Sequence, residues 1–451
     1  MKNFKLIIQL VSLVWLSSCE KFLDEKPVKS YATPSKVVNL QAILDYYPSM
    51  NTSDISGGEI SASDYYLSDA QWAALATENF RNMYVWSAKD VYPLGSNDWS
   101  NAYKSVYIAN TAIDGLNKIK ADQSGFEWNN VMGQALAFRA KFFLQIASVW
   151  SMSFDSNSAA ADLGIPLRLN SDFNELSVRS SLQQTYDQIL KDLKAAVLLL
   201  PVSQVSPLRP SRPAAYGLLA RTYLSMRDYV SAGKYADSCL QLSNQILDFN
   251  TLNPSAAYPV PKLNTEVIFE SYMTTAGPIN PTRSFIDLDL YNSYAADDLR
   301  KVVFYKDNNN GTYAFKGSYE GSAVLFSGLA TNEIYLTRAE CAARAGRLQD
   351  AMNDVNTLLS KRWNKSKPYV PYTASSIKEA LDIVLKERRK ELVMRGLRWI
   401  DIKRLNREGA GIVQSRQLNG ITYTLPPNDP RYALAIPEDI ITLSGIQQNP
   451  R

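Results

Sequence analysis

The chain has 451 residues, of which 46% are hydrophobic, 11% aromatic and 20% charged, a composition typical of folded globular proteins. It contains no histidine, which excludes Ser-His-Asp and Cys-His catalysis, histidine-ligated zinc and imidazole acid–base chemistry. The formal net charge is +4, so the charge gives no indication of nucleic-acid binding, and no nucleic-acid partner is expected.

The first eighteen residues have the layout of a secretory signal peptide. Lys2 and Lys5 precede an apolar stretch, Leu6 to Leu16, that is too short to span a bilayer as a mature helix. The motif Leu-Ser-Ser-Cys at 16–19 resembles a bacterial lipobox, in which cleavage precedes a cysteine that is then lipidated. We therefore predict a signal peptide over residues 1–18 and a lipid anchor at Cys19. The alternatives are an ordinary signal peptide and an uncleaved anchor.

The other two cysteines, Cys239 and Cys341, lie in helical patterns. An exported chain of this size that relied on disulfides would carry more cysteines, so buried free thiols are favoured over a disulfide.

Helical periodicity dominates from about residue 99 to 245. Apolar and aromatic side chains recur at three- and four-residue steps over 99–120 and 128–150, which predicts a helical hairpin. The same spacing predicts a long helix over 181–200, ended by Pro201. The proline-rich stretch 201–213 is expected to be an irregular connection.

A repeat appears when the chain is compared with itself at an offset of 119 positions. Ala220 then coincides with Ala339 and Ala232 with Ala351, within the alternating large and small residues of a tetratricopeptide helix pair. Gly346 marks the turn of the second copy. We predict a mostly α fold, a tetratricopeptide-like scaffold of helical hairpins over about 99–245 and 332–405, with long irregular loops and a few short strands.

Three irregular stretches interrupt or follow these helices, at about 46–95, 250–330 and 409–451. The second is rich in proline and contains the run Asp-Asn-Asn-Asn-Gly at 307–311 between short aromatic segments. Long loops on a helical scaffold are typical of binding proteins. We predict one domain over 19–451, with ligand-binding loops at 46–95 and 250–330 and an irregular C-terminal segment at 409–451.

Glu387, Glu391 and Asp401 are the candidate carboxylates for an enzyme. A glycosidase must keep one carboxyl protonated near neutral pH, whereas nearby positive charge lowers carboxyl pKa values. Four arginines lie within a turn or two of these carboxylates: Arg388, Arg389, Arg395 and Arg398. Ion pairs that brace the helix are therefore the favoured interpretation. Cys341 has no histidine to activate it as a nucleophile.

Aromatic residues in the loops are the candidate ligand contacts. Flat aromatic rings stack on the apolar faces of sugars, and Asp, Asn and Arg bond the hydroxyls. Most of the 8 Trp and 26 Tyr have helical spacing and are expected in the core. The predicted ligand-binding residues are Asp64, Tyr65, Tyr66, Trp72, Tyr291 and Tyr294.

The sequence resembles the SusD/RagB family of outer-membrane lipoproteins from Bacteroidetes along nearly the whole mature chain. The segment 19–24, Cys-Glu-Lys-Phe-Leu-Asp, is similar to the family's lipidated start. Further matching segments lie at 137–140, 164–167, 219–224, 332–336, 387–392 and 398–404. The chain departs from the family pattern at Arg395, where an acidic residue is common, and at Arg451, where an aromatic residue is common.

The resemblance implies a non-catalytic subunit on the cell surface, anchored in the outer membrane through Cys19. It would capture oligosaccharides for a TonB-dependent, SusC-like barrel, without a cofactor. Three alternatives remain at this point: a peptide ligand in the same uptake role, a carboxylate-dependent glycoside hydrolase, and a tetratricopeptide adaptor that binds no small ligand.

Overall fold

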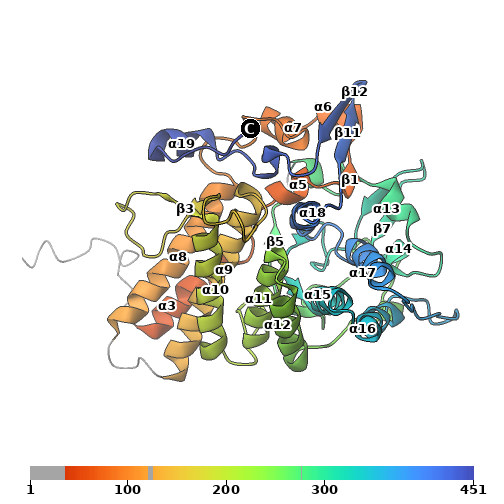
Figure 1. Cartoon of the computed structure of the whole chain (residues 1–451), viewed down its shortest axis with the longest axis horizontal. Coiled ribbons are helices and arrows are strands. Elements are labelled where there is room, and N and C mark those ends of the chain that lie inside the picture. Colours follow the sequence, from red (N-terminus) through yellow and green to blue (C-terminus); the bar gives the residue numbers. More distant parts are fainter. Residues whose placement is uncertain (1–35, 120–124, 276) are drawn as a thin grey trace, which may run out of the picture.

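The computed structural model describes residues 36–119, 125–275 and 277–451. Its long helices pack side by side as successive antiparallel neighbours, from α8 on the left of Figure 1 to α16 and α17 on the right. This confirms the mostly α, hairpin-based fold predicted from the sequence. The long helices are α8 (Asp98–Lys118), α9 (Phe126–Trp150), α10 (Leu182–Leu199), α11 (Arg212–Met226), α12 (Tyr229–Leu242), α15 (Thr331–Arg344), α16 (Leu348–Ser360) and α17 (Ile377–Glu391).

The beginnings of the helices follow from local sequence. Asn97 and Ser181 each start a helix with a capping box, in which the side chain accepts a hydrogen bond from the third helical residue. Ser211 caps α11, where Pro213 in the first turn loses no helical hydrogen bond. Helix α10 ends at Leu199, two residues before Pro201, as predicted.

The internal repeat corresponds to two helical hairpins. Helix α15 begins 119 residues after α11, and α16 begins 119 residues after α12. Gly346 has a φ of 74° at the turn of the second hairpin, a conformation that favours glycine. The small residues permit close approach, since a Cβ on Gly233 in α12 would lie 2.9 Å from the Cβ of Cys341 in α15. Cys239 and Cys341 are free and buried, as predicted.

Shorter helices lie in the predicted loop regions, in the C-terminal segment and, for α3 and α18, outside both. They are α3 (Val37–Leu44), α4 (Tyr47–Met50), α5 (Gly57–Ser61), α6 (Asp69–Ala73), α7 (Glu78–Tyr84), α13 (Leu288–Asn292), α14 (Arg300–Val303), α18 (Arg398–Asn406) and α19 (Glu438–Ser444), with 3-10 turns η2 (Phe249–Thr251), η3 (Gly277–Ile279) and η4 (Pro430–Tyr432). One buried apolar cluster runs from Leu40 through these helices to Ile446, so helices and loops share a core.

Within the described residues the strands are short and pair in twos, all antiparallel. The pairs are β1 (Tyr65–Tyr66) with β6 (Phe285–Ile286), β2 (Leu163–Pro166) with β3 (Arg179–Ser181), β4 (Val267–Phe269) with β10 (Leu329–Ala330), β5 (Tyr272–Met273) with β9 (Leu325–Phe326), β7 (Tyr305–Asp307) with β8 (Tyr313–Phe315), and β11 (Gln414–Leu418) with β12 (Ile421–Leu425). The β1–β6 pair joins the two predicted ligand-binding regions.

The C-terminal segment is more regular than predicted. Strands β11 and β12 form a hairpin, and α19 follows, so the prediction of an irregular segment over 409–451 is wrong for these residues. The buried positions of β11 include Gln414 and Arg416. Because core-facing positions of a strand are normally apolar, these two polar residues remove the apolar–polar alternation that predicts a strand. The guanidinium of Arg416 lies 3.6 Å from the ring centroid of Tyr84.

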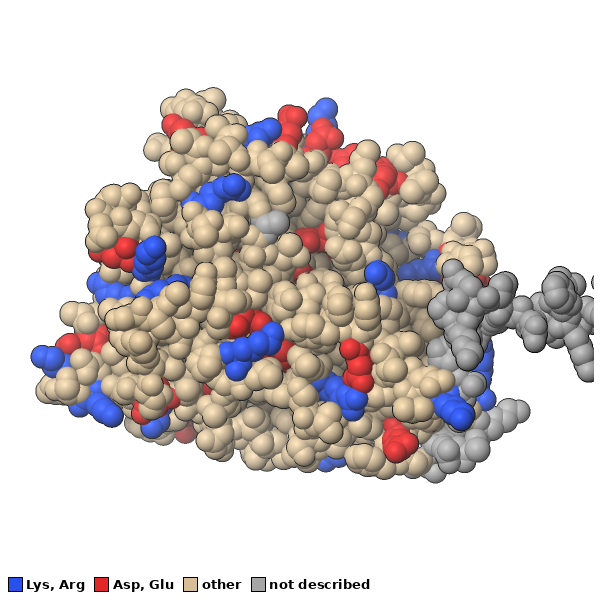
Figure 2. All heavy atoms as spheres, turned by 180° about the vertical axis from the view of Figure 1, so that it is seen from behind, with Lys and Arg blue, Asp and Glu red and all other residues tan. Residues whose placement is uncertain are grey.

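No helix of the described residues is long and apolar enough to cross a membrane. The predicted signal peptide and the predicted anchor at Cys19 lie outside the described residues. On the face shown in Figure 2, acidic and basic side chains are interspersed on a largely uncharged surface. Any charge complementarity to a ligand on this face would therefore come from individual side chains and not from a large charged patch.

Candidate functional site

A cavity of about 570 Å³ lies among the loops of the second predicted ligand-binding region. Three segments form it: residues 255–258, residues 281–285 and the β7–β8 hairpin. We call it the loop cavity. Its lining residues are Ser255, Ala256, Ala257, Tyr258, Pro281, Thr282, Ser284, Phe285, Lys306, Asn308, Asn310, Ala314, Phe315 and Lys316.

The lining of the loop cavity suits a hydroxyl-rich ligand. Four hydroxyl groups and two amides supply donors and acceptors, while Tyr258 and Phe285 supply aromatic surface. Tyr258 is 37% exposed, so its ring is accessible. Among the lining residues that the structure describes there is no carboxylate, but there are two lysines, Lys306 and Lys316. The cavity is therefore polar and locally positive.

Lys316 holds one wall of the loop cavity in place. Its ammonium group donates hydrogen bonds to the backbone carbonyls of Pro254 and Ala256. Partial burial, and then the neighbouring charge of Lys306, lower the pKa of Lys316 below its usual value. An anionic group in the cavity would relieve the repulsion between the two lysines.

The turn of the β7–β8 hairpin is fixed by its own side chains. The Asn310 Oδ1 atom accepts hydrogen bonds from the backbone N–H and the hydroxyl of Thr312, at 3.2 and 2.7 Å. Gly311 has a φ of 81°, which other residues rarely adopt. Asn308 donates to the same threonine hydroxyl at 3.0 Å. The asparagine run thus forms an ordered edge of the cavity.

Two predicted ligand residues support the walls of the loop cavity without lining it. Tyr66 packs on Phe285 with ring centroids 5.5 Å apart. Tyr291 stacks on Tyr313 of β8, with centroids 3.5 Å apart and planes 13° apart. Both tyrosines are half-buried. They hold the segment 281–285 and the hairpin from outside the cavity.

Three other predicted ligand residues are buried, which corrects the sequence-based prediction. Asp64 is 1% exposed and pairs with Arg389 at 2.8 Å. Tyr65 is buried and donates to the carbonyl of Ile60. Tyr294 is buried, and its hydroxyl donates to the carbonyl of Lys390. A sugar cannot stack on covered rings, so these residues have structural roles.

Trp72 lies in α6, outside the lining of the loop cavity. Its indole N–H points to the carbonyl of Arg81 at 3.4 Å, and the ring packs partly against the core. The ring is half-buried, so one part of it remains accessible.

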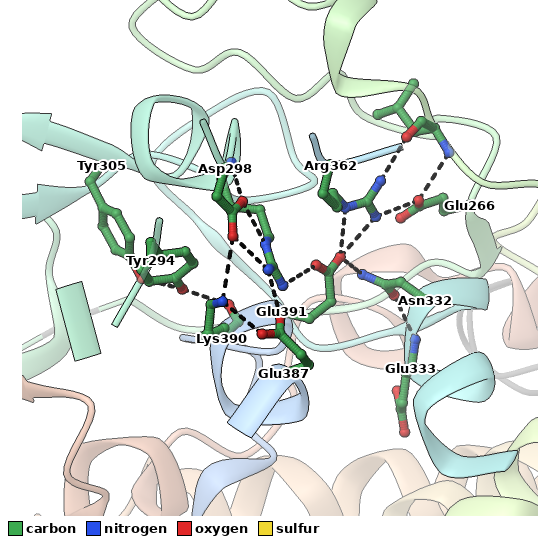
Figure 3. A network of polar contacts seen from close by, with 12 residues as sticks. Glu266, Tyr294, Asp298, Tyr305, Asn332, Glu333, Arg362, Glu387, Lys390 and Glu391 are labelled. Atoms are coloured by element: carbon green, nitrogen blue, oxygen red, sulfur yellow. Dashed lines mark hydrogen bonds and ion pairs between the residues drawn. The ribbon is translucent and has the colours of Figure 1, made fainter. Parts of the chain in front are cut away.

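The carboxylates considered for catalysis are ion-paired, as the sequence predicted. Glu391 accepts from Arg362 at 2.8 Å and pairs with Arg300 at 3.2 Å, within the buried network of Figure 3. Glu387 pairs with Arg300 at 2.6 Å and with Lys390 at 2.7 Å. These contacts leave neither carboxylate free as a general acid or base.

Asp401 in α18 is likewise paired with buried basic side chains. Burial alone would raise its pKa, but the guanidinium groups of Arg388 and Arg404 outweigh burial and lower the pKa to about 2. The distances to these arginines are 2.9 and 2.8 Å. Asp401 is therefore ionised at neutral pH and cannot donate a proton in acid catalysis.

A loop-borne carboxylate pair that the sequence did not reveal lies at Glu270 and Glu320. Glu270 is fully buried, and both carboxylates pair with Lys262, at 3.3 and 2.7 Å. Burial, and then the neighbouring Glu320, raise the pKa of Glu270 to about 9. Neither glutamate lines the loop cavity. The raised pKa favours the protonated form of Glu270, but the group lies away from the candidate ligand.

We expect Glu270→Gln to remove a pH dependence of stability. Folded Glu270 keeps its proton up to about pH 9, whereas the unfolded side chain loses it near its usual value. The stability of the natural chain therefore falls as pH rises from about 4.5 towards 9. Between pH 5 and 8, the natural chain should lose about 1–3 kcal/mol more than Glu270→Gln in denaturant unfolding.

The control for this measurement is Glu127→Gln, at an exposed position in the first turn of α9. Its pH profile should run parallel to that of the natural chain. If Glu270→Gln also runs parallel, Glu270 is ionised when folded.

A second cavity, of about 340 Å³, lies between α8, α19 and the loop after β2. Its aromatic floor includes Trp99 and Tyr103, but Trp99 is 4% exposed and packs on Trp150. The hydroxyl of Tyr103 donates to Pro166, and the amide of Asn110 donates to Arg168 and Asn170. Tyr107 and Phe173 also line this cavity and are exposed, so it offers mainly apolar and aromatic surface. The loop cavity lies in a predicted ligand-binding region and is therefore the preferred candidate site.

The loop cavity residues that the sequence reasoning missed are Tyr258, Lys306, Asn308, Asn310 and Lys316. The asparagine run at 307–311 between two strand-like segments was visible in the sequence, and it predicts a hairpin turn. No local sequence pattern shows that residues 255–258 and 281–285 face this turn.

Comparison with known proteins agrees with this fold. The family SusD-like_3, described as "Starch-binding associating with outer membrane", matches residues 21–224, and the SusD family matches residues 306–441. The SusD-like protein P2 of Formosa agariphila is 24% identical over 90% of this chain and 91% of its own length. The chain belongs to the SusD/RagB family, whose members are associated with the outer membrane.

Solved structures share the fold at lower identity. A SusD superfamily protein from Bacteroides thetaiotaomicron has a TM-score of 0.73 at 22% identity, covering 92% of this chain and all of its own. A putative sugar-binding protein from Bacteroides vulgatus has a TM-score of 0.74 at 20% identity, with 93% and 99% covered. A laminarin-binding SusD-like protein has a TM-score of 0.64 at 16% identity, with 92% and 97% covered.

Proposed function

We propose that this protein is a non-catalytic, substrate-binding lipoprotein of the cell surface. It captures oligosaccharides in the loop cavity and passes them to a TonB-dependent, SusC-like outer-membrane barrel. The observation that carries the proposal is the polar, aromatic-edged loop cavity in a chain of this family. A related protein that binds laminarin supports a glycan as the ligand class. The predicted anchor at Cys19 would hold the protein in the outer membrane.

The state of the candidate carboxylates supports a role without catalysis. Glu387, Glu391 and Asp401 are all ion-paired with buried basic groups. The Glu270–Glu320 pair lies outside the loop cavity. We therefore expect the protein to bind glycans and release them unchanged, which chromatography of the glycan after prolonged incubation would show.

Within the loop cavity, Tyr258 is the stacking platform, and Asn308, Asn310 and the hydroxyls bond the sugar. Tyr66 and Tyr291 support the walls, and Trp72 is a candidate for an outer contact with a longer chain. An aromatic side chain has few rotatable bonds, so it loses little conformational entropy when a sugar stacks on it. We therefore expect moderate affinity.

The two lysines favour glycans that carry carboxylate or sulfate groups over neutral ones. Lys306 is exposed at the cavity, and Lys316 is held by backbone carbonyls next to it. An anionic group between them would gain from both charges, and the gain would weaken as salt screens it.

We expect Lys306→Gln to weaken binding of an acidic oligosaccharide by about 3–10-fold at low salt, as measured by calorimetry. Affinity for a neutral glycan should not change. Lys378→Gln, at an exposed position on α17, is the matched charge control and should leave both affinities unchanged. If Lys306→Gln weakens the binding of acidic and neutral glycans equally, the proposed preference for acidic ligands is contradicted.

A further inference from the structure

A small cavity inside the scaffold is lined by two side chains whose N–H groups have no acceptor among residues 36–119, 125–275 and 277–451. It has a volume of about 50 Å³ and lies where α9, α11 and α18 meet. Arg395 is 4% exposed, and none of its three side-chain nitrogens bonds to any described residue. The indole nitrogen of Trp399, which lines the same cavity, likewise has no partner among the described residues.

Of the basic side chains that line this cavity, only Arg395 has no carboxylate partner among the described residues. Lys141 and Arg221 also line it, but each has a carboxylate partner at 2.6 Å, Asp54 and Glu333 respectively. Within the described part of the chain, no carboxylate lines the cavity itself, and none pairs with Arg395. Glu59 accepts the backbone N–H of Gly396 at 2.8 Å but does not pair with the guanidinium of Arg395. The positive charge of Arg395 is therefore left without a carboxylate partner among the described residues.

Aromatic rings compensate Arg395 only in part. Its guanidinium lies 4.8 Å from the ring centroid of Tyr319 and 4.3 Å from that of Phe326. Such rings attract a cation, but they offer no acceptor in the plane of its N–H groups. The guanidinium cannot lose its proton, and a buried charge without a counter-charge is costly. The N–H groups therefore need an acceptor that the described part of the chain does not provide.

A small anion fits this site better than water alone. A water molecule needs about 10–15 Å³ of such space, so the cavity has room for a single-atom anion with one or two waters. Water would satisfy the N–H groups but would leave the charge unbalanced, whereas an anion does both. Gln145 and Ser148 line the cavity and are half-buried, which gives the ion a route from solvent.

We propose that the cavity between α9, α11 and α18 binds an inorganic anion of chloride size, held by the Arg395 guanidinium and the Trp399 indole N–H. The anion neutralises the buried arginine and stabilises the contact of α18 with the helical hairpins. The site lies among other residues than the loop cavity, so it is independent of the proposed glycan binding.

The test is thermal unfolding of the mature chain in halide and halide-free salts at equal ionic strength. The chain is refolded from denaturant in sodium gluconate, and chloride or bromide then replaces gluconate stepwise. A saturable rise in Tm of about 2–4 °C is expected. No difference between chloride and gluconate would overturn the proposal.

Two variants locate the effect. Arg395→Met removes the charge and should abolish the dependence of Tm on halide, whereas Arg347→Met, at a largely exposed position, should keep it. If Arg395→Met does not fold, Trp399→Phe keeps a ring and removes only the indole N–H, and it should shift half-saturation to higher chloride. An anomalous bromide peak beside Arg395 in crystals would support the site, and only water density there would contradict it.

Discussion

Glu391→Gln is expected to lower the free energy of unfolding by about 3–5 kcal/mol. Glu391 is fully buried and accepts from Arg362 and Arg300, which are both 1% exposed. Its Oε1 atom also accepts from Asn332 at 2.9 Å. Burial would raise the pKa of Glu391, but Arg362 and then Arg300 outweigh it and lower the pKa. The substitution leaves two buried guanidinium groups short of a negative charge.

Denaturant unfolding followed by tryptophan fluorescence measures this loss. The control is Asp382→Asn on the same helix, where the ion pair with Lys378 is exposed. This variant should lose less than about 0.5 kcal/mol. A loss below 1 kcal/mol for Glu391→Gln would mean that the network of Figure 3 contributes little to stability.

Tyr258→Ala should weaken glycan binding by at least about tenfold, which corresponds to about 1.4 kcal/mol or more. Its ring is the accessible tyrosine surface of the loop cavity, and no other tyrosine that the structure describes lines the cavity. Because the ring is 37% exposed, its removal should change the melting temperature by only about 1–2 °C. Calorimetric titration with the best-binding oligosaccharide checks the first effect, and differential scanning calorimetry checks the second.

Tyr107→Ala is the matched control for Tyr258→Ala. Tyr107 is 46% exposed and lines the apolar cavity beside α8 instead of the loop cavity. Its loss should leave glycan affinity unchanged. If Tyr107→Ala abolishes binding and Tyr258→Ala does not, the ligand binds between α8 and α19.

The helical scaffold could be predicted from sequence because its determinants are local. The 119-residue offset between the two tetratricopeptide-like hairpins matches the starts of their helices, and the turn glycine Gly346 lies where expected. Capping residues and helix-ending prolines act within a few positions. That Glu387 and Glu391 are ion-paired could also be predicted, but their arginine partners, Arg300 and Arg362, lie far away in the sequence and could not.

The candidate site could be predicted only as a region. Whether a loop tyrosine faces solvent or core depends on strand partners far along the chain, as for Tyr65, which lies opposite Ile286. Tyr294 is buried because it bonds to the end of α17. Tyr258 stands among small residues without periodicity, and only the fold brings it to the β7–β8 hairpin. Local patterns carry no information about such long-range contacts.

The measurement that tests the central proposal most directly is calorimetric screening of the mature chain against neutral and acidic oligosaccharides and against peptides. We expect reversible binding of at least one glycan, lost in Tyr258→Ala and retained in Tyr107→Ala, with the glycan recovered intact. Binding of peptides with no glycan bound, or cleavage of the glycan, would contradict the proposed function.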